Sequence, residues 1–186
     1  MSSLDVIERR GAQTFKWATN VFNFGLLTVG LDHVTLGRVH LLRLVMGQLR
    51  LETPNPDLLQ ASDHLNAAIG QIREANQADF LSRALLPLAW LHALTGAWDA
   101  SRQRLDEAFA LATRGGNARN NWQGGMRLHL IDTLLHRARL FGNTDYPWPS
   151  RTPQIDLDEA AALIDICGYH RRDEELADAR RALAGR

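Results

Sequence analysis

Apolar side chains recur every three or four residues along most of this chain, and alternation with a period of two is almost absent. Spacings of three and four place side chains on one face of an α-helix, whereas a period of two is typical of a β-strand. The pattern therefore predicts an all-α protein of seven to eight helices, over about 6–19, 26–51, 56–76, 78–94, 98–113, 125–141, 156–166 and 171–183.

Prolines and glycines mark the ends of these predicted helices. Pro54 and Pro56 interrupt helical periodicity, and Pro56 suits the first turn of the next helix, where its missing N–H costs least. Gly96 and Gly168 follow apolar runs as helix-ending residues. Pro87 lies inside the segment 78–94, so we expect either a kink or a helix start there.

A helical unit recurs three times, with a small residue where two helices must approach and larger apolar residues around it. The first helix of each copy centres on Gly37, Ala89 or Thr133, with His40, His92 or His136 three residues later. The second helices share a spacing of four and then three: Ala61, Leu65, Ala68; Ser101, Leu105, Ala108; and Ala160, Ile164, Cys167.

This spacing resembles the tetratricopeptide repeat, W-x2-L-G-x2-Y followed by A-x3-F. Further segments resemble the C-terminal helical arrays of large bacterial proteins with NACHT-type NTPase domains; they are 7–18, 31–42, 104–126, 126–140 and 163–179. The resemblance implies a partner-binding or ligand-sensing array, and it brings no catalytic residues with it. It covers the array alone, so we expect a free-standing relative or one part of a split system.

The predicted architecture is a right-handed α-solenoid of stacked antiparallel helical hairpins in a single domain, 1–186. The hairpins are expected at about 26–76, 78–114 and 125–168, flanked by helices at 4–20 and 171–184. The copies are unevenly spaced, because 52 residues separate Gly37 from Ala89 and 44 separate Ala89 from Thr133. Insertions in the loops would account for that.

Composition narrows the functional classes. Basic and acidic residues balance at 21 each, which argues against general nucleic-acid binding, since that needs a basic excess. A single cysteine, Cys167, fits a reducing compartment, and an apolar signal segment is not seen at 1–10. We therefore expect a cytoplasmic protein with no membrane span, no cofactor and no bound metal.

Helical phase predicts a partner-binding face on the inner helices of the array. Its side chains are Arg38, Arg83, Trp90, Arg127, Leu134 and Arg137. Arginine and tryptophan are enriched at interface hot spots, and arginine pairs with carboxylates through two hydrogen bonds. The sequence thus predicts a non-enzymatic interaction module, which binds a protein or peptide within a bacterial signalling or defence assembly.

Two alternatives remain open at this point. The first is a self-associating structural subunit, in which an end helix carrying Val6, Ala12 and Phe15 pairs between copies. The second is a metal-dependent enzyme that uses His129, Asp132 and His136, which share a helix face. His33 and His40 repeat the same seven-residue spacing, so common ancestry of the repeats explains it without a metal.

Three smaller features have mainly structural interpretations. Trp148, in the Tyr-Pro-Trp-Pro segment 146–149, is expected to tuck over the end of a hairpin, although a partner contact is the alternative. The acids at 173–175 suit the N-terminal turn of the last helix. Cys167 lies in an apolar run, where a thiol packs as a small hydrophobe.

Phosphate-loop, nucleophile-elbow and zinc-protease motifs are missing from the sequence.

Overall fold

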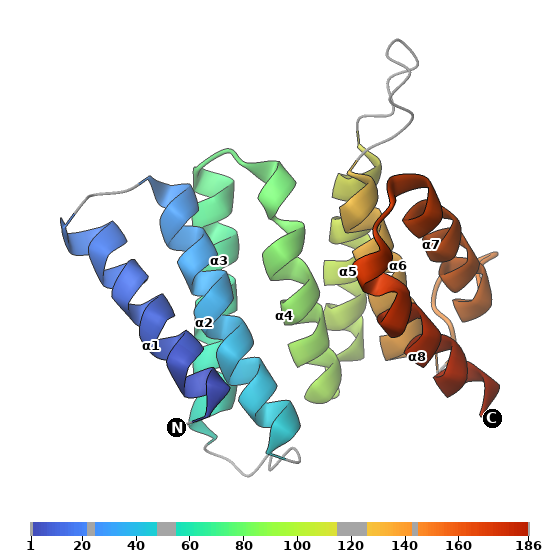
Figure 1. The fold of residues 1–186 in the computed structure, drawn as a ribbon, viewed down its shortest axis with the longest axis horizontal. Coiled ribbons are helices and arrows are strands. Elements are labelled where there is room, and N and C mark those ends of the chain that lie inside the picture. Colours follow the sequence, from blue (N-terminus) through green and yellow to red (C-terminus); the bar gives the residue numbers. More distant parts are fainter. Residues whose placement is uncertain (1, 22–24, 48–54, 115–125, 143–144, 186) are drawn as a thin grey trace. The chain divides into compact units, whose positions relative to one another are not determined.

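The computed structural model describes residues 2–21, 25–47, 55–114, 126–142 and 145–185, and every regular element in them is helical (Figure 1). The all-α prediction is confirmed for this part of the chain. The α-helices are α1 (Ser3–Lys16), α2 (Leu26–Met46), α3 (Pro56–Glu74), α4 (Ser82–Leu94), α5 (Trp98–Thr113), α6 (Arg127–Phe141), α7 (Pro153–Cys167) and α8 (Asp173–Ala184). A π-helical turn, Trp17–Val21, follows α1, and short 3-10 turns precede α4 and α8 at Ala78–Phe80 and His170–Arg172.

Side-chain caps account for several helix starts. The Asn55 side chain accepts hydrogen bonds from the backbone N–H groups of Asp57 and Leu58, ahead of Pro56 in the first turn of α3. Thr152 caps α7 in the same way, which makes that helix begin three residues before the predicted start. Gly168, with φ of 63°, ends it as predicted.

Two predicted features are refined by the structure. Pro87 lies inside a continuous α4, and the expected helix 78–94 divides into a 3-10 turn and α4 instead. The second predicted helix ends at Met46, and its expected continuation over 48–51 lies outside the described residues. The polar loop expected at 117–125 lies outside them too.

The chain divides into two compact units, Met1–Ala97 and Trp98–Arg186. In the first unit, α2 packs side by side with α3, α1 packs on α2, and α4 packs against both α2 and α3 (Figure 1). Gly37 lies at a close approach of α2 to α3. A Cβ atom placed there would lie 2.7 Å from Cγ of Leu65, so any residue other than glycine would force Leu65 to shift.

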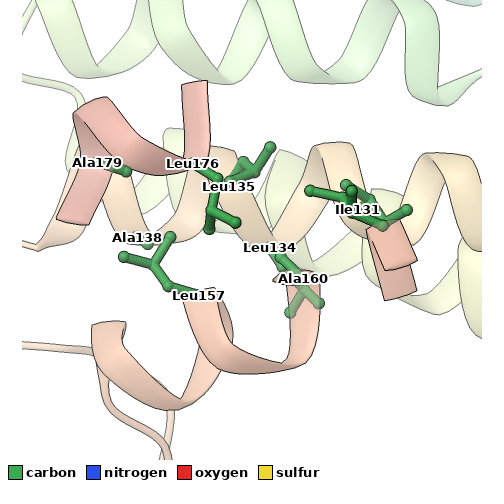
Figure 2. Close-up of a cluster of buried hydrophobic side chains, with 9 residues drawn as sticks. Ile131, Leu134, Leu135, Ala138, Leu157, Ala160, Leu176 and Ala179 are labelled. Carbon is green, nitrogen blue, oxygen red and sulfur yellow. The ribbon is translucent and has the colours of Figure 1, made fainter. Parts of the chain in front are cut away.

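The second unit is organised around α6 and α7, which pack against each other. α5 packs on α6, and α8 packs on both α6 and α7. Figure 2 shows the core that α6, α7 and α8 share; its buried side chains are Ile131, Leu134, Leu135, Ala138, Leu157, Ala160, Ile164, Leu176 and Ala179. Burial of these apolar groups drives the association of the helices.

The single domain and the solenoid arrangement stay predictions. The expected middle hairpin, 78–114, spans the boundary between the two units, so it stays a prediction. In the described part of the chain, every helix falls short of the combined length and apolar character that crossing a bilayer requires.

The glycine contact gives a matched pair of substitutions. Gly37 and Gly70 both lie within helices, but a Cβ at Gly70 would meet nothing within 4 Å. Both alanine variants gain helix propensity, and only Gly37→Ala forces atoms into buried Leu65. We expect Gly37→Ala to be less stable than Gly70→Ala by about 1–3 kcal/mol in urea unfolding. Equal stability would contradict the close approach.

Candidate functional site

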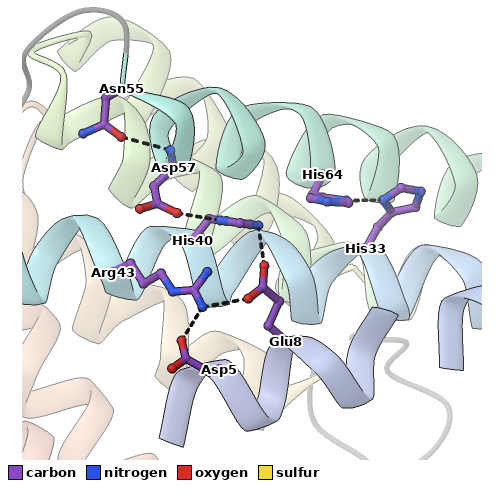
Figure 3. Close-up of polar contacts among 8 residues, drawn as sticks. All are labelled: Asp5, Glu8, His33, His40, Arg43, Asn55, Asp57 and His64. Atoms are coloured by element: carbon purple, nitrogen blue, oxygen red, sulfur yellow. Dashed lines mark hydrogen bonds and ion pairs between the residues drawn. The ribbon is translucent and has the colours of Figure 1, made fainter. Parts of the chain in front are cut away.

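A connected group of titratable side chains lies where α1, α2 and α3 meet, and we call it the α1–α3 network (Figure 3). The spacing of three between the acids on α1 and of seven between the histidines on α2 turns each pair toward the neighbouring helix. Its members are Asp5 and Glu8 on α1, His33, His40 and Arg43 on α2, and Asp57 and His64 on α3.

Arg43 ties α1 to α2. Its Nη2 donates to Oδ1 of Asp5 and to Oε2 of Glu8, each at 2.7 Å. The hydrogen bond from Arg43 lowers the pKa of Glu8, because it favours the ionised carboxylate. The backbone N–H of Ser2 and the Arg43 guanidinium together lower the pKa of Asp5. Both acids are therefore held as anions at the start of the first helix.

His40 links all three helices. Its Nδ1 lies 2.7 Å from Oδ1 of Asp57 on α3, and its Nε2 lies 3.7 Å from Oε1 of Glu8 on α1. Only 8% of His40 is exposed, whereas the side chains of Glu8 and Asp57 are 35% and 33% exposed, so the ring is buried and its two carboxylate partners are partly solvated. The ring therefore acts as a bridge between the acids of two different helices.

His33 and His64 form the second part of the network. Their Nδ1 atoms lie 2.7 Å apart, so one donates a proton and the other accepts it. Burial lowers the pKa of both rings, because it disfavours the charged imidazolium. The edge of Phe15 on α1 packs on His33, and His40 stacks parallel to His64 with 6.0 Å between ring centroids.

Chemically, the network does two things. It holds α1 on the hairpin of α2 and α3 through charged hydrogen bonds, and it brings two imidazole nitrogens to one point. The seven-residue spacing of His33 and His40 was visible in the sequence, but their partners Asp57 and His64 were missed. Finding them required the register of α2 on α3, which the Gly37–Leu65 contact fixes.

The predicted binding residues divide between the units. In the first unit, Arg38 on α2 and Arg83 on α4 are exposed, and Trp90 on α4 is partly buried. Arg83 lies 5.3 Å from the centre of the Phe80 ring. Neither Arg38 nor Arg83 pairs with a carboxylate in the part of the chain that the structure describes. These two arginines keep the exposure that the prediction required.

The expected exposure of Leu134 and Arg137 is wrong. Leu134 is 0% exposed and lies in the core that α6 shares with α7 and α8 (Figure 2). Arg137 is 3% exposed and lies between two aromatic rings, 4.4 Å from the centre of Phe109 and 4.0 Å from that of Trp148. Arg127 is partly buried at the start of α6.

The segment 145–151 explains the burial of Arg137. Trp148 is 7% exposed, donates from Nε1 to Asp106 at 2.5 Å, and packs against Phe141. Asp106 also accepts from Nη2 of Arg137 at 3.4 Å. The tucked position predicted for Trp148 is confirmed. This loop lies over the helix face that periodicity alone left open to solvent.

The residues of the metal-enzyme alternative have other partners. Asp132 accepts from Nε of Arg172 at 2.8 Å, and Nδ1 of His136 lies 2.8 Å from the backbone oxygen of Asp132. Burial lowers the pKa of His136. Groups of three or more side chains arranged to hold a metal are absent among the described residues. His129 and its neighbours therefore show no such cluster.

The predicted position of the acids at 173–175 is confirmed. The acids Asp173, Glu174 and Glu175 occupy the first turn of α8, where they complement the helix dipole. Cys167 is partly buried at the end of α7.

Comparison of the chain with protein-family models, with curated proteins and with solved structures finds no match in any of the three.

The Arg43 contacts predict a salt-sensitive stability. In Arg43→Met the acids of α1 lose their hydrogen-bond donor, so we expect a lower urea midpoint than in the wild type. Salt screens the charges of this partly exposed cluster, and the difference should shrink in high salt. Arg10→Met, at an exposed position of α1, is the control and should change the midpoint little. An Arg43→Met protein as stable as this control would contradict the role of Arg43.

His136 predicts a pH-dependent stability of the second unit. Its folded pKa is lowered, so the stability it contributes is present above its unfolded pKa, about 6.5, and is lost as the pH falls below that value. Between neutral pH and about pH 5, His136→Gln should lose less free energy of unfolding than the wild type. Other histidines titrate in both proteins, so the difference isolates His136. Identical slopes in urea unfolding would contradict this.

Proposed function

We propose that this chain is a tetratricopeptide-like helical-repeat module that binds an acidic protein or peptide on its first unit. The observation that carries the proposal is the state of Arg38 and Arg83, which are exposed and lack carboxylate partners in the described residues. Most other described arginines are engaged; those paired with carboxylates are Arg43, Arg102, Arg104, Arg137, Arg139, Arg151, Arg172, Arg180 and Arg181.

The helix packing of the first unit supports the repeat part of the proposal. α4 packs on both helices of the preceding hairpin, α2 and α3. In arrays of helical hairpins, each new first helix packs on the preceding pair in this way, and the first helices line the inner surface. Arg38 and Arg83 lie on those two first helices, α2 and α4, with Trp90 further along α4.

The chemistry of these side chains selects the partner class. A guanidinium without an internal carboxylate can pair with a carboxylate of a partner through two parallel hydrogen bonds. Trp90 adds apolar contact area, and Arg and Trp are common among hot-spot residues. The right-handed solenoid, a cytoplasmic site of action and a place in a bacterial signalling or defence assembly belong to this proposal through the family resemblance alone. In it, the chain has no catalytic role and no cofactor.

Self-association is a second candidate function, favoured by exposed apolar side chains on α1. Ile7 is 45% exposed and Trp17, just beyond α1, is 46% exposed. Large apolar groups on an end helix are typical of surfaces that pair between copies. Sedimentation over a wide concentration range would show a rising mass if this candidate is right, and a constant monomer mass would contradict it.

A peptide array tests the interaction proposal directly. It should hold acidic peptides with free C-termini beside copies in which Asp and Glu are replaced by Asn and Gln. We expect the wild type to retain acidic peptides selectively, and Arg38→Glu/Arg83→Glu to weaken their Kd by at least about tenfold. The loss follows from repulsion between the new and the peptide carboxylates.

The control is a second double variant, which carries the same change of charge at two other exposed arginines. Arg10→Glu/Arg114→Glu alters the net charge by the same amount, and both side chains are exposed. Retention should be unchanged in this variant. Equal weakening in the two double variants, or equal binding of the neutral peptides, would contradict a specific site at Arg38 and Arg83.

A further inference from the structure

We infer that His33 and His64 form a binding site for one divalent transition-metal ion of the Cu²⁺ or Ni²⁺ class. The two imidazoles come from different helices, α2 and α3, and their Nδ1 atoms converge to 2.7 Å (Figure 3). Both residues are partly buried. Two imidazole nitrogens from two packed helices lie close enough to bind one ion, once the ion replaces the hydrogen bond between them.

The backbone around the pair is held in place by the helix contact. A Cβ at Gly37 would lie 3.3 Å from Cβ of His64 and 2.7 Å from Leu65, and one at Gly30 would lie 2.9 Å from Ile72. Glycines therefore let α2 and α3 approach on both sides of His33, which lies between positions 30 and 37. A site preorganised in this way loses little conformational entropy when it binds an ion.

Imidazole is a suitable ligand for Cu²⁺, Ni²⁺ and Zn²⁺, and the geometry discriminates among them. Metal–nitrogen bonds of about 2.0–2.1 Å combined with the observed 2.7 Å separation give an angle at the metal of about 80–85°. A right angle, as in square-planar or tetragonal sites, requires about 2.9 Å, whereas a tetrahedral angle requires about 3.3 Å. The two nitrogens would have to move apart less for a square-planar or tetragonal ion than for a tetrahedral one, which favours Cu²⁺ or Ni²⁺.

A metal ion can replace the hydrogen bond between the two rings without a change in the net charge of the rings. In the hydrogen-bonded pair, one Nδ1 carries a proton and the other accepts it. When an ion binds, both rings are neutral with the proton on Nε2, and each Nδ1 donates a lone pair to the metal. Water would complete the coordination, since larger groups of ligating side chains are absent from the described residues.

Charges of both signs surround the pair. The network holds three carboxylates, those of Asp5, Glu8 and Asp57, and one guanidinium, that of Arg43. At His64 the charge of His40 acts to lower the pKa, and the charge of Asp63 acts to raise it. His40 is held by Asp57 and Glu8, so it lies beside the pair as a stacked neighbour and is excluded as a third ligand.

Titration of the tag-free full chain with Cu²⁺ tests this inference, followed by electron paramagnetic resonance. We expect one ion per chain, with nitrogen hyperfine structure from two imidazoles. His33→Ala and His64→Ala should each weaken binding at least about tenfold. His170→Ala, at an exposed histidine outside the network, should bind like the wild type. Zn²⁺ should bind more weakly than Cu²⁺.

Far-UV circular dichroism establishes that each variant is folded. If an alanine variant unfolds, His64→Gln replaces it, since glutamine keeps a hydrogen bond to His33 and removes the imidazole ligand. The inference is overturned if the wild type fails to bind Cu²⁺ or if binding survives loss of either His33 or His64. Loss in His170→Ala, or Zn²⁺ binding as tight as Cu²⁺ binding, would also overturn it.

Discussion

The close approach of α2 to α3 at Gly37 is the contact on which the first unit depends. Leu65 fills the space that any side chain at position 37 would occupy, so the two helices have a defined register. That register places His33 opposite His64 and brings His40 within hydrogen-bond reach of Asp57. Because protein interiors are close-packed, a change at this contact would displace the side chains packed around it. The polar network is thus a consequence of apolar packing.

Much of this fold could be predicted from the sequence, because its signals are local. Pro56 and Gly168 bound helices whatever the tertiary structure, and α5 covers the predicted segment, Trp98–Thr113. The small residue predicted where two helices approach is also confirmed at Gly37, in the first copy of the repeat. Cap contacts such as that of Thr152 moved helix starts by a few residues, which periodicity alone does not resolve.

The candidate site was harder to predict, because its contacts join residues far apart in the sequence. Helical phase predicts a surface position for Leu134 and Arg137, but Leu134 lies in the core shared by α6, α7 and α8, and Trp148 of the segment 145–151 packs on Arg137. Neither contact is encoded in the periodicity of α6 itself. Arg38 and Arg83, by contrast, are exposed, and no described carboxylate pairs with them. The buried polar contacts therefore stabilise the fold, whereas Arg38 and Arg83 are the residues on which the proposed function rests.

The register of α2 on α3 is the central claim, and the hydrogen bond between His33 and His64 reports it most directly. A scalar coupling between the two Nδ1 nuclei, measured by NMR on ¹⁵N-labelled protein, arises only if one nitrogen donates a proton to the other. The account predicts a resolved coupling between these two residues and between no other pair of histidines. Two well-resolved rings without coupling, under conditions where the shared proton exchanges slowly with water, would contradict it.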